Sequence, residues 1–404
     1  MVSPGDTRRL RLGAAGLGRA FMLMLPTFTA DPRVRLSAVA DPRPEARAQF
    51  ERELGGRAHA SVEALCADPD VDAIYIATPH GLHAEHVLAA AREGKHVLVE
   101  KPMALTLAEC EAMIEAASRA GVALVVGHSH GFDAPILRTR AIVERGDYGR
   151  VRMIAALNYT DFLYRPRRPE ELDTAQGGGA VFSQAVHQVD VVRLLAGGHA
   201  RTVRAHVGAW DRARPTEGAY SALLTFDDGA FASLTYSGYG HFDSDELMGW
   251  IGELGHARDA AQYGGARVLL RSASTSAEEA ALKERRAYGQ ETGVVRAPAA
   301  HNHFGMVLVS CDGADLRPLP NGVMIYDDAR AWLDPIAPPR VPRVEVIDEL
   351  YDAVFRGAAP LHDGAWAMAT LEVSLAMLES ARSGKEQVLS HQVGARAVRA
   401  DRAG

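Results

Sequence analysis

The chain of 404 residues is 47% hydrophobic and 24% charged, with a formal net charge of −7. This length predicts two domains, and the acidic balance argues against nucleic acid or an anionic membrane surface as a partner. Three cysteines without a C-x-x-C pair favour a reducing compartment, and we find neither a signal-peptide core nor a run of about 18 apolar residues. We therefore expect a cytoplasmic globular protein.

The first element is a short strand beginning near Arg9, which runs into a glycine turn and an apolar helix through Leu25. A G-x-G turn between a strand and a helix lets the backbone approach a pyrophosphate, whose charge the helix N-terminus stabilises. Phe21 occupies the third small position, so the fingerprint is imperfect. The turn and the first helical residues are Gly16, Leu17, Gly18, Arg19 and Ala20.

The second strand, residues 34–40, ends in Asp41, which lies 23 residues after Gly18. This is the spacing of the acid that binds the adenine ribose hydroxyls. Asp41 would repel a 2'-phosphate, so the sequence predicts NAD rather than NADP, although Arg43 nearby could soften that preference.

Strands and helices continue to alternate. We expect strands at 73–77, 96–100 and 122–127 and helices at 84–93, 107–120 and 136–144. Strict alternation is typical of a parallel sheet with helices on both faces.

Lys101 follows the buried strand that ends near Val99, between Glu100 and Pro102. Ligands of parallel sheets bind beyond the carboxyl ends of the strands, so Lys101 is expected to face a crevice. Pro102 disfavours a helical Lys101, and Thr106 with Glu109 has the spacing of a capping box. The alternative is a solvated lysine in an ordinary loop.

With these residues in place, the chain resembles the Gfo/Idh/MocA family of nicotinamide-dependent oxidoreductases, whose hallmark is Glu-Lys-Pro after the fifth strand. The resemblance covers most of the chain, including Thr78-Pro79 with His83 and the run 177–179 before a helix that bears His187. Segments 127–133 and 158–169 are most similar to the phthalate 4,5-dihydrodiol (4,5-dihydroxyphthalate) dehydrogenase branch.

The resemblance implies an α/β chain with an N-terminal Rossmann domain, a doubly wound parallel sheet, at 1–149. A C-terminal α+β domain with a largely antiparallel open sheet follows at 150–404, its final helices at 344–383 bracing both domains. Strands are expected at 151–159, 201–209, 220–226, 230–236, 268–271, 306–310 and 323–326, with a polar helix-prone insertion at 272–288. The outer face of such a sheet commonly mediates dimers, so we expect a homo-oligomer, dimer or tetramer.

The family places NAD on the first domain. The residues that the resemblance assigns to the cofactor are Gly16, Leu17, Gly18, Arg19, Ala20, Asp41, Arg43, Thr78, Pro79, His83, Glu100 and Lys101.

Ser183, His187 and Asp190 recur at helical spacing and are expected on one face of a helix. The family pattern there is Asp-x-x-x-His, and Ser183 stands where the Asp would be. His187 is then the natural general base, with Lys101 sharing the proton or hydrogen-bonding the substrate oxygen. The alternatives are a structural histidine and a structural Asp190.

The substrate is expected to be a small molecule. Two arginines in the segment 164–168 would hold its carboxylates as bidentate donors, unless that segment is only a solvated charge run. The substrate-binding candidates are His130, Tyr164, Arg165, Arg168, Ser183, Gln184 and His187. Four histidines at strand ends (His80, His83, His128 and His130) lack a completing ligand set, so no metal is expected.

The resemblance implies NAD-dependent oxidation of a secondary alcohol, a carboxylated cyclic cis-dihydrodiol of the phthalate 4,5-dihydrodiol type in aromatic degradation. A sugar or inositol dehydrogenase is the nearest alternative. An NAD-dependent glycosidase and a non-catalytic nicotinamide sensor are the alternatives of other classes.

Overall fold

The computed structural model describes residues 8–262, 264–290 and 298–397. The chain forms two compact units, of which the first comprises residues 1–128, 281–296 and 341–368 and the second residues 129–280, 297–340 and 369–404. This division falls earlier than the predicted boundary at 149, because helix α6 (Ala134–Arg145) packs on α7 (Val186–Ala196) and β12 (Ala314–Leu319) of the second unit.

The first unit is built on a six-stranded parallel sheet with strand order β3-β2-β1-β4-β5-β6, as predicted for a Rossmann domain. Four of its strands are apolar and almost wholly buried, as expected of a sheet covered on both faces. The strands are β1 (Leu10–Ala15), β2 (Val34–Ala40), β3 (Arg57–His59), β4 (Ala73–Ile76), β5 (His96–Val99) and β6 (Leu124–Val126).

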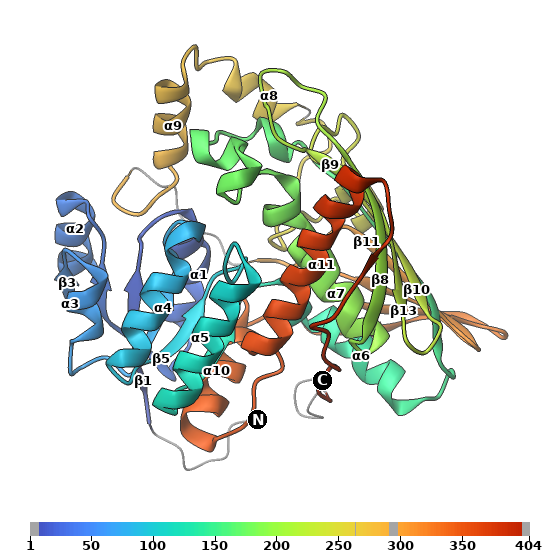
Figure 1. Ribbon diagram of the computed structural model, residues 1–404, viewed down its shortest axis with the longest axis horizontal. Helices are drawn as coiled ribbons and strands as arrows, with labels where there is room; N and C mark the ends of the chain where they lie inside the picture. The colour runs from blue at the N-terminus through green and yellow to red at the C-terminus, as the bar shows by residue number, and fades with distance from the viewer. Residues whose placement is uncertain (1–7, 263, 291–297, 398–404) are drawn as a thin grey trace. The chain divides into compact units, whose positions relative to one another are not determined.

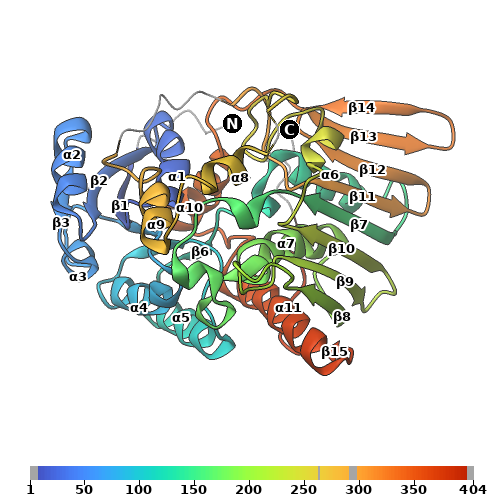
Figure 2. The same cartoon turned by 90° about the horizontal axis from the view of Figure 1, so that it is seen from above.

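Helices cover both faces of this sheet. Figure 2 shows α1 and α10 on one side and α4 and α5 on the other. Helix α5 begins with the predicted capping box, in which Thr106 and Glu109 bond each other's backbone amides. The helices are α1 (Arg19–Ala30), α2 (Pro44–Leu54), α3 (Val62–Cys66), α4 (His83–Arg92), α5 (Leu107–Ala120) and α10 (Val344–Arg356).

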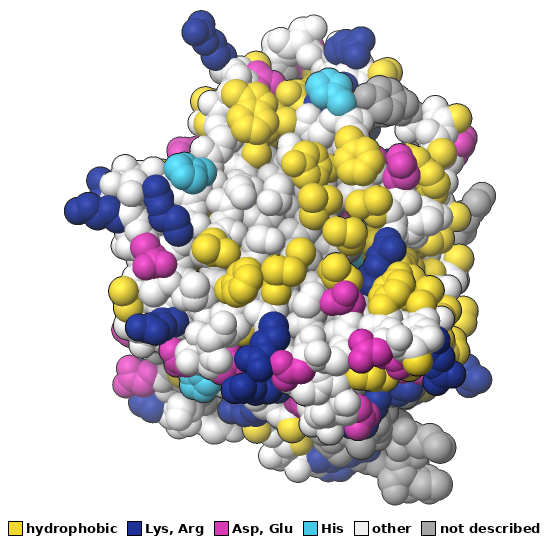
Figure 3. Space-filling model, turned by 90° about the vertical axis from the view of Figure 1, so that its right-hand side faces the viewer, with side chains coloured by type: hydrophobic (Ala, Val, Ile, Leu, Met, Phe, Trp, Pro, Cys, Tyr) yellow, Lys and Arg dark blue, Asp and Glu magenta, His cyan; other side chains and the backbone are white. Residues whose placement is uncertain are grey.

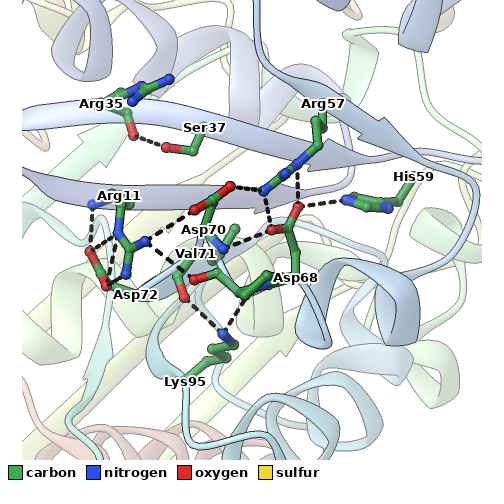
Figure 4. A network of polar contacts seen from close by, with 11 residues as sticks. Arg11, Arg35, Ser37, Arg57, His59, Asp68, Asp70, Val71, Asp72 and Lys95 are labelled. Carbon is green, nitrogen blue, oxygen red and sulfur yellow. Dashed lines mark hydrogen bonds and ion pairs between the residues drawn. The ribbon is translucent and has the colours of Figure 1, made fainter.

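A polar network ties together the amino ends of the strands, opposite the end where ligands of such sheets bind (Figure 4). Arg11 at the start of β1 pairs with Asp72 before β4, and the Lys95 ammonium before β5 donates to the carbonyls of Asp68 and Val71 at 2.8 Å each. Arg57 of β3 pairs with Asp68. The network therefore holds in place the loop that precedes β4.

The second unit is built on a nine-stranded sheet with strand order β14-β13-β12-β11-β7-β10-β9-β8-β15, which can be followed in Figure 2 and is seen nearly edge-on in Figure 1. Its pairs are antiparallel except for β10 with β7, which is parallel. The other strands are β7 (Val151–Tyr159), β8 (Ala200–Gly208), β9 (Ala219–Phe226), β10 (Phe231–Ser237), β11 (Met306–Cys311), β13 (Gly322–Asp327), β14 (Ala331–Pro335) and β15 (Gln387–Val388).

Three strands of this sheet, β12, β14 and the two-residue β15, were not predicted from the sequence, and the predicted strand at 268–271 is wrong. Strands β12 and β14 both contain a proline, which argues against a strand in sequence analysis. Residues 268–271 lie instead in or at the end of helix α8 (Gly265–Leu270). Its Arg267 donates to the carbonyls of Tyr239 and Gly240 and lies over the Tyr164 ring, so tertiary contacts decide the conformation of a short apolar run.

One face of the sheet carries exposed hydrophobic side chains. They gather on the face shown in Figure 3, with few charges among them. Phe231 of β10 pairs in register with Met153 of β7, and both are about two-fifths exposed. Leu223 and Tyr326 are exposed on other strands.

The last helices complete the two units. Helix α9 (Ser276–Glu284) lies in the predicted helix-prone insertion, and α11 (Gly364–Ser383) runs from the last segment of the first unit into the second. Among the described residues no helix is long and apolar enough to cross a membrane.

Candidate functional site

The glycine turn after β1 has the shape that a pyrophosphate requires. Gly16 has φ +87°, and a Cβ there would lie 2.8 Å from the Ala77 carbonyl oxygen. A Cβ on Gly18, which begins α1, would meet no atom within 4 Å. The first turn of α1 carries no acidic residue, so its amides and dipole favour an anion. The residues present therefore fit a dinucleotide at this turn.

Asp41 and Arg43 form a rigid pair beside that turn. Asp41 accepts hydrogen bonds from the Leu17 amide at 2.8 Å and from the Arg43 Nε at 2.9 Å. Burial would raise the pKa of Asp41, but the hydrogen bonds from Arg43 and Leu17 outweigh it and lower that pKa. Asp41 is therefore an ionised acceptor at the carboxyl end of β2, where the ribose hydroxyls of a dinucleotide bind.

His83 connects the two other predicted cofactor loops. Its ring nitrogens lie 2.9 Å from the carbonyl oxygens of Thr78 and Pro102, and its side chain is fully buried. Burial lowers the pKa of His83. A fully buried ring has no exposed surface for a ligand, so in this structure His83 ties the Thr78 and Pro102 loops together.

Glu100 and Lys101 follow β5 as predicted. The Tyr75 hydroxyl donates to Glu100 at 2.6 Å, and burial raises the pKa of Glu100. This bond directs the Glu100 carboxyl toward β4. Lys101 is half-buried at the carboxyl end of β5.

In the second unit, His187 lies where a π-helical turn (Val181–Ala185) passes into α7. Such turns are rare and often occur at functional sites. The predicted α-helical spacing from Ser183 to His187 is therefore wrong in detail, because the π turn adds a residue. Ser183 is half-buried, and Gln184 and His187 are buried.

His187 belongs to a cluster of three rings. Its centroid lies 4.7 Å from that of His130 and 5.0 Å from that of Phe304, and His130 lies 5.0 Å from Phe304. Tyr236 stacks on Phe304 at 6.1 Å. The three rings are inclined to one another, with interplanar angles of 68°, 34° and 42°, so the cluster packs two imidazoles against one aromatic ring.

Two carboxylates fix the His130 segment. Asp133 lies 2.6 Å from Nδ1 of His130, an arrangement that sets the tautomer of an imidazole. Asp190 of α7 accepts hydrogen bonds from the Ser129 hydroxyl and the Gly131 amide. The sequence left open whether Asp190 has a structural role. In the structure Asp190 holds the segment that carries His130.

Sequence reasoning missed Glu253, His303 and Phe304. Burial would raise the pKa of Glu253, but the charges of Arg165, His130 and His303 outweigh it and lower that pKa. Nε2 of His303 lies 2.7 Å from the Ile251 carbonyl oxygen, and burial lowers the pKa of His303. In the sequence, two histidines and a phenylalanine occur just before β11, and this group was the signal that could have identified His303 and Phe304.

The predicted carboxylate-binding arginines already have acidic neighbours. Arg165 donates to Asp161 at 3.0 Å and lies 3.6 Å from Glu253. Arg168 lies 3.7 Å from Glu170 and its side chain is 39% exposed. Tyr164 lies under the Arg267 guanidinium at 3.9 Å. Of the two arginines, Arg165 is the one whose acidic partner Glu253 also interacts with His130.

A search of the described residues finds no group of three or more His, Cys, Asp or Glu side chains placed to hold a metal ion.

Comparison with protein families gives two adjoining matches. Residues 10–128 match the oxidoreductase family with an NAD-binding Rossmann fold, and residues 136–258 match the GFO/IDH/MocA C-terminal domain.

Individual relatives agree with these matches. A 1-carboxy-3-chloro-3,4-dihydroxycyclohexa-1,5-diene dehydrogenase from Comamonas testosteroni is 48% identical over 92% of this chain and 95% of its own length. The crystal structure of a putative dehydrogenase from Bordetella bronchiseptica RB50 superposes with a TM-score of 0.89 at 43% identity, covering 95% of this chain and all of that one. A myo-inositol 2-dehydrogenase from Thermotoga maritima is 30% identical over 46% of this chain and 55% of its own.

Proposed function

Because the chain belongs to the Gfo/Idh/MocA family and is an NAD-dependent oxidoreductase, we propose that it oxidises a carboxylated cyclic cis-dihydrodiol, of the type formed from phthalate at positions 4 and 5. The hydroxyl-bearing carbon loses a hydride and its oxygen loses a proton, which gives a ring ketone. Enolisation of that ketone yields an aromatic catechol. One diol and one NAD⁺ thus give one catechol, one NADH and one proton.

The observation that carries the proposal is the likeness to the Comamonas testosteroni enzyme, whose name states a carboxylated dihydroxycyclohexadiene. That likeness extends over nearly the whole of both chains, whereas the likeness to the inositol dehydrogenase covers about half of each. The ring cluster of His130, His187 and Phe304 supports a flat diene ring, because aromatic faces pack well against planar rings.

We assign proton transfer to His187 and Lys101. Neutral imidazole accepts a proton near neutral pH, which suits a base that takes the hydroxyl proton as the alcohol is oxidised. A half-buried lysine ammonium can hydrogen-bond the alcohol oxygen or exchange a proton with it. NAD supplies the hydride acceptor when it is bound.

His130 takes the place of the carboxylate-supported base that Ser183 leaves missing. Asp133, 2.6 Å from Nδ1, holds the imidazole ring of His130 in one orientation and sets its tautomer. We propose that His130 orients the second hydroxyl of the diol and receives a proton during enolisation.

Arg165 is proposed to bind the substrate carboxylate. Its 3.6 Å separation from Glu253 is longer than the ~2.7–2.9 Å of a charge-assisted hydrogen bond, so a bidentate substrate carboxylate offers it a closer partner. Glu253 then rejects carboxylates placed elsewhere on the ring.

The chain is proposed to form a homo-oligomer through the exposed face of the nine-stranded sheet. The apolar side chains gathered there, among them Met153, Leu223, Phe231 and Tyr326, favour burial against a second copy (Figure 3). Light scattering at micromolar concentration tests this. A chain that stays monomeric contradicts it, and Phe231→Glu is expected to dissociate the oligomer.

A panel of substrates tests the proposed reaction. Carboxylated cis-dihydrodiols, neutral cis-dihydrodiols, inositols and aldoses are each mixed with enzyme and NAD⁺, and reduced nicotinamide is followed by absorbance. We expect the highest kcat/KM for a carboxylated diol, with catechol formed in equal amount. A higher value for an inositol or aldose would overturn the proposal. Glycoside cleavage without net absorbance change, or NADH binding without any turnover, would replace it with one of the other classes.

A further inference from the structure

The polar insertion predicted at residues 272–288 has no part in the proposed chemistry, yet its end packs on the dinucleotide turn. We call residues 285–290 the Tyr288 strap. The Tyr288 amide donates to the Leu17 carbonyl oxygen at 3.0 Å, and the Tyr288 carbonyl oxygen accepts from Arg43 at 3.2 Å. Leu17 is the residue between the two glycines of the turn.

The side chain of Tyr288 secures these backbone contacts. It is 4% exposed, its ring meets the edge of Phe21 of α1 at 5.6 Å, and its hydroxyl donates to Glu53 of α2 at 2.7 Å. Gly289 has φ +90°, and a Cβ there would lie 3.1 Å from the Ala46 Cα. The strap therefore lies closely against α1 and α2, all within the first compact unit.

Arg43 is held from several sides as a result. It donates to Asp41 at 2.9 and 3.1 Å, to the Leu17 carbonyl oxygen at 3.1 Å and to the Tyr288 carbonyl oxygen at 3.2 Å. An arginine near this position is the group that accommodates the 2'-phosphate of NADP in dinucleotide domains. Here its guanidinium is committed to acceptors of the protein.

We propose that the Tyr288 strap is a cofactor-positioning element that sets the preference for NAD over NADP. By holding Arg43 on Asp41, the strap keeps the Asp41 carboxylate in place for the ribose hydroxyls and keeps the guanidinium away from a 2'-phosphate. A strap that only buttressed α2 would contribute equally to both cofactors. The proposal uses the NAD dependence of the family and does not depend on the identity of the substrate.

Dissociation constants for NADH and NADPH, measured by calorimetry on the full chain, test the strap. Tyr288→Ala removes the ring from Phe21 and the hydroxyl from Glu53. We expect NADH to bind about tenfold more weakly and NADPH to bind no more weakly than to the wild type, so the preference falls about tenfold. Tyr288→Phe keeps the ring contact with Phe21 and removes only the hydroxyl, so NADH is expected to bind about threefold more weakly at most. Arg285→Lys, at an exposed strap position, is the matched control and should leave both constants unchanged.

Turnover measurements distinguish a role of the strap in positioning the cofactor from a general structural defect of the variant. With saturating NAD⁺, kcat of Tyr288→Ala is expected to stay within about twofold of the wild type while KM for NAD⁺ rises. Equal losses for NADH and NADPH, or unchanged constants for both, would overturn the proposal. If Tyr288→Ala does not fold, Glu53→Ala gives the test at the smaller size expected of Tyr288→Phe: it removes the partner of the Tyr288 hydroxyl, and NADH should bind about threefold more weakly while NADPH binds as to the wild type.

Discussion

The two glycines of the dinucleotide turn should respond to the same substitution in opposite ways. Gly16→Ala places a methyl group 2.8 Å from the Ala77 carbonyl oxygen at a residue with φ +87°. A left-handed conformation costs an ordinary residue about 1–2 kcal/mol, and overpacking against a fixed backbone about 1–3 kcal/mol more. We expect the free energy of unfolding to fall by about 2–5 kcal/mol, and Tm by roughly 5–15 °C.

Gly18→Ala should leave the folded chain nearly unchanged and weaken NAD binding. Gly18 has φ −79°, which alanine adopts freely, and its Cβ would meet no atom within 4 Å. The stability cost is about 1 kcal/mol or less. The open space is where a pyrophosphate must approach the backbone, so the methyl group would displace about two hydrogen bonds to a charged group. This predicts a loss in NAD affinity of about 100-fold.

Thermal unfolding without cofactor and titration with NADH measure the two effects separately. Gly18→Ala is the control for Gly16→Ala in the first measurement, since both add one methyl group to the same turn. A Gly16→Ala chain as stable as the wild type would refute the steric argument. Unchanged NADH affinity in Gly18→Ala would show that the pyrophosphate does not bind at this turn.

Three further predictions follow from the site. Lys101→Ala and His187→Ala should each lower kcat by roughly 100- to 10,000-fold with little change in NADH affinity, and wild-type turnover of either variant would remove that residue from proton transfer. Arg165→Ala should raise KM about ten- to hundredfold for carboxylated diols and hardly at all for neutral ones, so equal effects on both would make Arg165 a structural residue. Burial raises the pKa of Asp245 to about 6, so protonation of Asp245 favours the folded state. Relative to Asp245→Asn, the wild type should lose about 2 kcal/mol of unfolding free energy as the pH rises from about 4 to 7, as measured by urea titration. An equal pH dependence of the unfolding free energy in the two proteins would contradict this.

Sequence patterns predicted the first unit well because its signals are local. The buried strands, the glycine turn before α1, Asp41 after β2 and the capping box of α5 each depend on residues a few positions apart. The prediction failed where a distant residue decides the conformation. Residues 268–271 are apolar enough for a strand, but Arg267 is held by carbonyl groups nearly thirty positions earlier and the segment is helical.

The candidate site was only half predictable for the same reason. His130 and His187 were identified from the sequence, but their ring contact with Phe304 joins three segments that no spacing rule connects. The π turn before α7 also changes the direction of Ser183 relative to His187, and nothing in its composition marks it.

The loss of the family carboxylate at Ser183 need not weaken the case for an enzyme. In the Asp-x-x-x-His pattern the carboxylate and the imidazole come from successive turns of one helix. Here Asp133 supports His130 three positions away in a short turn, and Asp190 of α7 holds that turn through Ser129 and the Gly131 amide. A carboxylate-supported imidazole thus lies 4.7 Å from His187, centroid to centroid. A sensor that only binds NADH has no use for an imidazole with its tautomer fixed in this way, whereas a diol that loses a hydroxyl proton in the oxidation and a ring C–H proton in the enolisation can use both histidines.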